Sequence, residues 1–330
     1  MGNILSITKQ GKLYRADNSI VFLDENKIKT KIPIKKITQI DIYSNITFDS
    51  EMLKLLYKYN IGINFYDHWS DKNYAEINMY NNKGSEKILV KQIEVYQTQR
   101  IQYIKKIYFG IQLNLIELLK KYQKRVDIGK KITKKINEIR KINFNNIKIN
   151  NYLSYEANMW NIFYSSLELI IKKEDFIFTN RSKRPPENKI NALISFINTK
   201  LYFVVNNEIK KTKLDNRIGF IHELTEESRF SLALDISEIF KPFFTYYFII
   251  NNINNKKITK SDFKDEIFLN ETGLRKINKL FYDYMNETIY NKKLKRNISY
   301  QYLIKLECYK LIKSIYNIEE YNAINFKDIT

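Results

Sequence analysis

The chain has 330 residues, enough for one large or two ordinary domains, and its hydrophobic fraction of 44% can form a sizeable core. It carries 56 Lys and Arg against 36 Asp and Glu, a formal net charge of +20. This excess favours a polyanionic partner, and no stretch approaches the roughly 20 apolar residues that span a bilayer. The composition therefore indicates a globular protein that binds nucleic acid, and it argues against a disordered chain or a membrane protein.

The cysteine content and the start of the chain bear on its compartment. Cys308 is the sole cysteine and cannot form an internal disulfide, which fits a reducing environment. The first residues lack the basic and apolar regions of a signal peptide. We therefore expect a cytoplasmic protein, with Cys308 as a small core residue of a Leu- and Tyr-rich helix.

Residues 1–80 predict a small β-rich domain. Short apolar runs bounded by Gly, Asp and Asn predict strands at Asn3–Thr8, Ser19–Leu23, Lys29–Ile34, Ile37–Tyr43 and Ile61–Tyr66. One helix is expected after Asp49, which can cap its first turn. The apolar residues of this helix follow helical spacing, at Met52, Leu55, Leu56 and Tyr59.

Residues 88–330 predict a large all-α domain, joined to the first by a polar linker at 81–87. Long 3.6-residue patterns predict helices near 86–122, 128–142, 151–173, 188–207, 230–252, 261–291 and 298–317. The fold class is therefore α+β. Most of the positive charge lies in the helical part, because residues 1–84 carry 12 Lys and Arg against 9 Asp and Glu.

Residues 120–141 form the most basic segment of the chain. They contain ten Lys and Arg residues and two acidic ones. Basic residues four positions apart would line one side of a helix and neutralise several DNA phosphates. The alternative is a solvated helix face in a Lys-rich protein.

Three carboxylates and one histidine stand in unusual places. Glu156 falls near the centre of an apolar face of 151–173, where a carboxylate must be protonated, paired or bound to a cation. Asp235 and Glu238 project from one side of another helix, beside apolar residues. His222 precedes that helix in a Gly-containing loop. One imidazole and two or three carboxylates suit Mg²⁺ or Mn²⁺, whereas buried ion pairs or surface acids are the structural alternative.

At these residues the sequence resembles the integrase-endonuclease family of CRISPR adaptation modules. The first matching motif is Glu156 followed by Phe163-Tyr164, and the second is Asn180–Leu193 (NRSKRPPENKINAL). The third is Gly219–His222 (GFIH), followed by Ser231–Asp235 (SLALD), Glu238 and Lys241-Pro242. The order and spacing of these motifs match along most of the chain.

The resemblance implies an endonuclease and integrase that inserts short foreign DNA into a CRISPR repeat array. A 3′-hydroxyl of the captured duplex would attack a phosphodiester of the repeat. Glu156, His222 and Glu238 would be the metal ligands, with Asp235 as a further catalytic residue. The residues expected to contact DNA are Arg181, Lys183, Arg184, Asn188, Lys130, Lys134, Arg217 and Lys241. The protein would form a homodimer through its β-rich domain and bind a small dimeric CRISPR-associated partner.

Two other functions stay open at this point. The chain could be a non-catalytic basic scaffold for nucleic acid, in which the carboxylates form structural ion pairs. It could also be a stand-alone Mg²⁺-dependent nuclease, because the same site serves hydrolysis and strand transfer and the two differ in the attacking oxygen.

Overall fold

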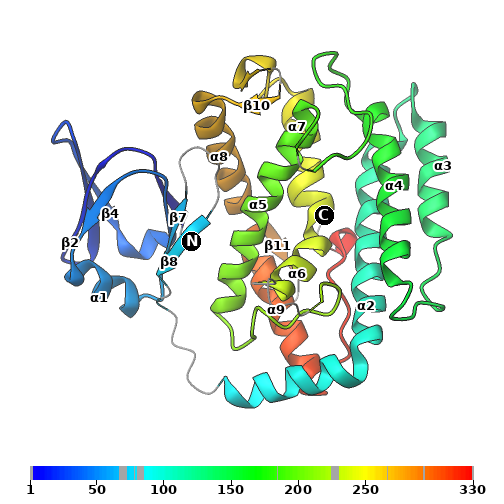
Figure 1. Ribbon diagram of the computed structural model, residues 1–330, viewed down its shortest axis with the longest axis horizontal. Coiled ribbons are helices and arrows are strands. Elements are labelled where there is room, and N and C mark those ends of the chain that lie inside the picture. Colours follow the sequence, from blue (N-terminus) through cyan, green and yellow to red (C-terminus); the bar gives the residue numbers. More distant parts are fainter. Residues whose placement is uncertain are drawn as a thin grey trace. The chain divides into compact units, whose positions relative to one another are not determined.

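The structure is a computed structural model (Figure 1). It describes residues 3–66, 73–77, 79, 85–183, 185–223, 230–265, 267–292 and 294–328. The chain divides into two compact units, Met1–Lys83 and Gly84–Thr330. The first unit is β-rich and the second is mostly helical, which confirms the predicted α+β class. Helix α2 begins at Glu86, inside the segment expected to be a linker, and residues 81–84 of that segment lie outside the described residues.

The described part of the first unit contains two four-stranded sheets. Its elements are β1 (Asn3–Ile7), β2 (Gly11–Ala16), β3 (Ser19–Asp24), β4 (Lys29–Pro33), η1 (Ile34–Lys36), β5 (Ile37–Ile42), β6 (Ile46–Phe48), α1 (Ser50–Lys58), β7 (Gly62–Tyr66) and β8 (Asn73–Ile77). One sheet has the order β1-β5-β7-β8, and only its β7–β8 pair is antiparallel. The other has the order β4-β3-β2-β6, and only its β2–β6 pair is parallel. The five predicted strands are confirmed, whereas β2, β6 and β8 add short or polar strands to them.

The core of the first unit is one buried apolar cluster. Both sheets and α1 contribute to it, with Leu13, Ile20, Ile40, Met52, Leu56 and Ile63 among its members. Helix α1 begins as predicted, because the Asp49 carboxylate accepts a hydrogen bond from the backbone N–H of Met52 at 2.9 Å. This cap starts the helix in the register that buries Met52, Leu55 and Leu56.

The second unit is built around the long helix α2. Its helices are α2 (Glu86–Gln123), α3 (Gly129–Arg140), α4 (Tyr152–Ile170), α5 (Lys189–Lys210), α6 (Ser231–Lys241), α7 (Phe248–Asn254), α8 (Glu271–Asn286) and α9 (Tyr300–Ile315), with short turns η3 (Lys260–Asp262) and η4 (Phe326–Asp328). Helix α2 contacts α3, α4, α6 and α9. Cys308 is fully buried in α9, as expected. In the described part of the chain, no helix is both long and apolar enough to cross a membrane.

The predicted helix at 230–252 is confirmed, and one stretch of it has the wider π-helical winding. A π-helical turn, η2 (Pro242–Tyr247), joins α6 to α7, so the helical run continues from Ser231 to Asn254. Pro242 has no N–H to donate to the preceding turn, and the chain rewinds around it. Such π-turns are frequent at functional sites.

The prediction of one helix over 261–291 is wrong. Within these residues the structure has a short hairpin of β9 (Phe263–Lys264) with β10 (Phe268–Leu269), then α8, then β11 (Thr288–Asn291), which pairs with β12 (Arg296–Ser299) beyond the predicted range. Asp265 and Lys295 have φ values of 50°, which end the strands in turns. Helix α8 starts at a cap, because the Asn270 side chain accepts a hydrogen bond from Gly273 N at 2.8 Å. The apolar residues of a hairpin and a helix therefore gave one apparent helical pattern.

The segment after α9 folds back along α2 and supports α6. Asn114 of α2 donates hydrogen bonds to the carbonyls of Ile239 and Ile324, both at 3.0 Å, and accepts one from Phe326 N at 3.0 Å. The rings of Phe326 and Phe243 stack with their centroids 4.1 Å apart. The C-terminal segment thus holds the helix that carries the candidate site.

Candidate active site

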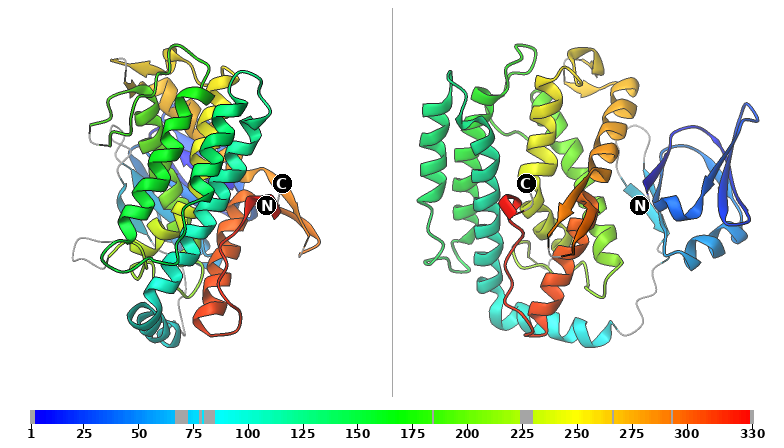
Figure 2. Two further views of the ribbon diagram at one scale, coloured as in Figure 1. Left: turned by 90° about the vertical axis from the view of Figure 1, so that its right-hand side faces the viewer. Right: turned by 180° about the vertical axis from the view of Figure 1, so that it is seen from behind.

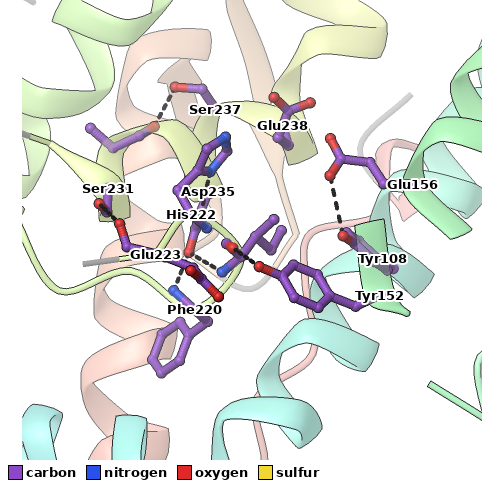
Figure 3. A network of polar contacts seen from close by, with 12 residues as sticks. Tyr108, Tyr152, Glu156, Phe220, His222, Glu223, Ser231, Asp235, Ser237 and Glu238 are labelled. Carbon is purple, nitrogen blue, oxygen red and sulfur yellow. Dashed lines mark hydrogen bonds and ion pairs between the residues drawn. The ribbon is translucent and has the colours of Figure 1, made fainter. Parts of the chain in front are cut away.

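The loop before α6 is held by the carboxylate of Asp235, which is fully buried. Its Oδ2 accepts hydrogen bonds from the backbone N–H groups of Phe220 and of Ile221, the latter at 2.9 Å. Its Oδ1 accepts from His222 N at 3.1 Å and lies 2.7 Å from His222 Nδ1 (Figure 3). A Cβ on Gly219 would come within 2.8 Å of Asp235 Oδ2, so a residue without a side chain is needed there.

These contacts set the state of the His222 imidazole. Because the Asp235 carboxylate is an acceptor, the proton sits on Nδ1 and Nε2 is left for another ligand. Burial lowers the pKa of His222, but the hydrogen bond and charge of Asp235, together with Glu238 and Glu156, raise it above its ordinary value. A carboxylate behind the ring is the usual support of a histidine that binds a metal.

The carbonyl groups of the same loop are held from the opposite side. Arg100 of α2 donates from Nε to the Phe220 carbonyl at 2.7 Å, and Tyr152 of α4 donates its hydroxyl to the Ile221 carbonyl at 2.9 Å. Arg100 also donates to the Tyr152 hydroxyl at 3.2 Å. The loop is therefore fixed by side chains from three helices, which leaves little freedom for His222.

Glu156 approaches from α4. Its carboxylate accepts a hydrogen bond from the hydroxyl of the buried Tyr108 at 3.2 Å and faces Glu238 of α6 (Figure 3). Burial first, and then the charge of Glu238, raise the pKa of Glu156 to about 7. A buried carboxylate whose pKa is raised by a second carboxylate marks a place that attracts a cation.

Lys241 provides a positive charge at this site. Glu238 and Lys241 are both buried and form an ion pair one turn apart on α6. The Lys241 ammonium also lies 5.2 Å from the ring centroid of Tyr202. Burial lowers the pKa of Lys241, but Glu238 and Tyr202 raise it more, and the pKa ends above its usual range. The ammonium is thus the present counter-charge of Glu238.

A cleft with a volume of about 470 Å³ opens beside these residues. It is lined by Leu153, Glu156, Ala157, Trp160, Asn161, Tyr164, Arg181, Lys183, Ser195, Asn198, Thr199, Tyr202, Glu238 and Lys241. Carboxylates, basic side chains and an aromatic wall therefore share one cavity. This combination suits a phosphate-bearing chain whose anionic groups meet the basic side chains and whose bases contact the apolar wall.

Glu156, Glu238 and His222 have the kinds of donor atoms that a divalent cation binds, but in this structure these atoms are not gathered around one point. Two carboxylates and one imidazole nitrogen are the ligands that Mg²⁺ or Mn²⁺ accept. Among the described residues, no three His, Cys, Asp or Glu side chains come close enough together to hold a metal ion as they lie. Glu238 is paired with Lys241, and His222 Nδ1 is bound to Asp235, so Nε2 is the imidazole nitrogen left for a metal ion. The residues therefore fit a divalent ion by their chemistry. In this structure the positive charge beside Glu238 comes from the ammonium of Lys241.

Replacing Glu156 with Gln is expected to change how stability depends on pH. The pKa of Glu156 is about 7 in the folded chain against an ordinary 4.5, so the folded state binds the proton more tightly and loses stability as pH rises from 4.5 to 7. In EDTA, the Gln variant should be more stable than the wild type above pH 7, by at most about 3 kcal/mol, and equal to it near pH 4. Urea unfolding across this range measures the difference.

Glu168 gives the matched control for that measurement. It lies exposed on the same helix, and Glu168→Gln should leave the pH profile unchanged. A loss of roughly 3–5 kcal/mol in Glu156→Gln at every pH would instead show a structural pair.

Two of the predicted DNA-contacting residues of the 180–193 segment have internal partners. Arg181 donates to Asn191 Oδ1 at 3.0 Å and to Ser195 Oγ at 3.1 Å, and it lines the cleft together with the exposed Lys183. The side chain of Asn188 accepts from Asn191 N at 2.9 Å and caps α5. Arg184 lies outside the described residues.

The other predicted DNA contacts are spread over the unit. Lys130 and Lys134 are exposed on α3, and Arg217 forms a two-point ion pair with Asp215, whose closer contact is 2.6 Å. Residues 120–141 are not one helix, because α2 ends at Gln123 and α3 begins at Gly129. The basic side chains therefore cannot form one row along a single helix.

Sequence reasoning did not identify Arg100, Tyr108 or Tyr152 as site residues. Tyr152 belongs to the predicted apolar face of its helix, and its ring is indeed buried, but its hydroxyl binds the His222 loop. Arg100 and Tyr108 lie on α2, about 120 residues before the loop that Arg100 holds. No local motif marks them, because their contacts depend on the packing of distant segments.

The fold and the site together define a class of protein: a β-rich unit is followed by a helical unit in which Glu156 and Glu238 line one basic cleft and act electrostatically on His222. The family model for the CRISPR associated protein Cas1 matches residues 5–283. This chain belongs to the Cas1 family.

Known relatives agree with this assignment over nearly the whole chain. The CRISPR-associated endonuclease Cas1 of Fusobacterium nucleatum is 33% identical over 322 residues, covering 95% of this chain and 93% of the relative. The solved structure of a Cas1 protein from Thermotoga maritima aligns with a TM-score of 0.79 at 28% identity, covering 97% of this chain and 98% of the other. A casposase bound to its integration product has the same fold, with a TM-score of 0.77 at 18% identity and coverage of 97% and 92%.

Proposed function

We propose that this chain is a divalent-metal-dependent DNA endonuclease and integrase that inserts short foreign DNA into a CRISPR repeat array. The observation that carries the proposal is that Glu156 of α4 and Glu238 of α6 line one basic cleft, and that the charges of both act on His222 in the loop before α6. Membership of the Cas1 family supports the same function.

Glu156, His222 and Glu238 are the residues that would hold the ion, either Mg²⁺ or Mn²⁺. When bound, the ion polarises a phosphodiester and lowers the pKa of an attacking hydroxyl or water. Asp235 is a positioning residue in this scheme, because all its hydrogen bonds go to the loop and to His222 Nδ1. Lys241 would exchange Glu238 for a phosphate of the DNA, since its ammonium already lines the cleft.

The proposed reaction is a transesterification. The oxygen of a 3′-hydroxyl forms a new bond to phosphorus, and the bond between that phosphorus and its original 3′ oxygen breaks. The departing oxygen takes up a proton and becomes a new 3′-hydroxyl, so the number of phosphodiester bonds is unchanged and no nucleotide is hydrolysed. The chain's own contribution is to orient the phosphodiester and to balance its charge through Lys241 and the basic wall of the cleft.

The proposed substrates are double-stranded DNAs, namely a short captured duplex and the CRISPR repeat. Arg181, Lys183 and Lys241 would hold phosphates inside the cleft, and Lys130 and Lys134 would hold phosphates outside it. We further propose a homodimer formed through the β-rich unit, and a small dimeric CRISPR-associated partner that joins two such dimers. The compartment would be the cytoplasm.

One observation favours the non-catalytic scaffold as the second candidate. The buried ion pair between Glu238 and Lys241 is the structural pairing that a scaffold would contain. The pH-dependent unfolding of Glu156→Gln separates the two functions. Replacing a structural carboxylate lowers the stability of the protein, whereas replacing a metal-binding carboxylate in EDTA does not.

Strand transfer tests the proposed function directly. The purified chain and its cognate small partner are mixed with a labelled duplex and supercoiled plasmid, with Mg²⁺, Mn²⁺ or EDTA. We expect joined product with either ion and none with EDTA. Tight, salt-sensitive binding without joining in any ion would contradict the proposal and favour the scaffold.

A further inference from the structure

The β11–β12 hairpin, Thr288–Ser299, stands out from the helices of the second unit (Figure 2). We infer that it is a second contact surface for the phosphate backbone of duplex DNA, separate from the cleft that contains Glu156 and Glu238. The inference takes the class of ligand, DNA, from the proposed function. The place where the DNA would bind, and the residues that would contact it, are argued from the structure of the hairpin.

The hairpin is unusually basic. Its twelve residues contain Lys292, Lys293, Lys295 and Arg296 and no acidic residue. Within the part of the chain that the structure describes, Lys292, Lys295 and Arg296 have no carboxylate at ion-pair distance. Other lysines of the unit are paired, for example Lys135 with Glu138 and Lys313 with Glu319, both at 3.0 Å. Four like charges within five positions repel one another, and a polyanion relieves that repulsion.

The hairpin is held in shape before any ligand binds. At its tip, the Asn291 side chain accepts a hydrogen bond from Leu294 N at 2.9 Å, and Lys295 turns the chain with a φ of 50°. At its base, Tyr300 N donates to the Glu287 carbonyl at 3.1 Å, and Ile298 is buried. A preformed surface loses less conformational entropy on binding, so its charges can act together.

Exposed apolar groups accompany the charges. Tyr290 is 58% exposed and Leu294 is 40% exposed. Arg296 lies 5.3 Å from the ring centroid of Tyr302 and donates to its hydroxyl at 3.1 Å, which orients the guanidinium. A two-stranded ribbon fits the major groove of DNA, where basic side chains meet phosphates and an aromatic ring meets bases or sugars. The excess of charge over apolar surface favours DNA over a protein partner.

The test compares two sets of substitutions in the full chain. The hairpin variant is Lys292→Gln, Lys295→Asn and Arg296→Gln, with Asn at 295 because it tolerates the positive φ. The control variant removes three exposed lysines of the same unit, with Lys264→Gln, Lys279→Gln and Lys327→Gln. Fluorescence anisotropy measures the dissociation constant for a short and a long labelled duplex at several salt concentrations.

We expect the hairpin variant to bind the long duplex roughly 10- to 100-fold more weakly, with a salt slope lower by about 2–3, since each lost phosphate contact removes about 0.9. The short duplex should show a smaller effect, and strand transfer at saturating DNA should be unchanged. The control variant should resemble the wild type.

Three outcomes would overturn the inference. If the wild type binds DNA and the hairpin variant matches the control at both lengths, the hairpin inference fails and the proposed function stands. If the variant loses the small adaptation partner but keeps its DNA affinity, the surface belongs to a protein. If the wild type binds no duplex at any salt concentration, both the inference and the proposed function fail.

Discussion

Replacing His222 with Ala is expected to lower the rate of strand transfer by roughly 1,000-fold or more, on the order of 4 kcal/mol in the activation free energy. The imidazole is the one nitrogen donor among the proposed ligands, and its Nε2 is the atom that the Asp235 contact leaves open. DNA affinity should change by less than about threefold, because the basic side chains of the cleft are untouched. Single-turnover strand transfer and anisotropy titrations measure the two quantities.

Two further variants make this result specific. His222→Gln keeps a polar side chain of similar length and should be as inactive as the Ala variant. Glu168→Gln, on the exposed face of α4, should transfer strands at the wild-type rate. Wild-type joining by His222→Ala would show that the site lies elsewhere, whereas loss of DNA affinity would show that His222 contacts the substrate instead.

Replacing Asp235 with Asn is expected to reduce both activity and stability. The carboxylate accepts hydrogen bonds on both oxygens, from Phe220 and Ile221 on one and from His222 on the other. An Asn amide has one oxygen, so in either orientation its NH₂ group faces N–H donors. We expect a loss of about 2–4 kcal/mol in the free energy of unfolding and a fall of at least about 100-fold in strand transfer.

A positioning role for Asp235 has a readout that simple destabilisation lacks. In the wild type the carboxylate holds the proton on His222 Nδ1, whereas an amide turned the other way would place it on Nε2. NMR of the nitrogen-labelled imidazole distinguishes these tautomers. Asp283→Asn, at an exposed position on α8, is the control and should alter neither tautomer nor stability. Full activity with an unchanged tautomer in Asp235→Asn would contradict the role.

Much of the site could be recognised along the chain. Glu156 interrupts an apolar face, and Asp235 and Glu238 lie three residues apart among apolar neighbours. Each is therefore recognisable in the sequence as a carboxylate whose burial would cost free energy unless it is paired. The strands of the first unit and the capped helix at Asp49 follow from patterns within a few residues of one another. Such features can be predicted because their physical causes are local.

The roles of these residues could not be predicted in the same way. Asp235 and Glu238 are neighbours on one helix, yet Asp235 binds the His222 loop and Glu238 binds Lys241. The basic residues at 120–141 were expected to line one side of a helix, but they are divided between α2 and α3 by the turn that the predicted helices 86–122 and 128–142 leave between them. Spacing shows which side chains share a face, but it does not show which distant group meets each of them.

The sequence by itself determined the β-rich and helical halves, the excess of positive charge and the carboxylates that stand among apolar residues, because composition and short-range periodicity decide these properties. Tertiary structure decided which of these residues meet. Arg100 and Tyr152 donate hydrogen bonds to the carbonyls of the same loop whose backbone N–H groups are bound by Asp235. These arrangements depend on contacts between segments roughly 70 to 120 residues apart, and hydrogen bonds across such separations form only when the helices pack.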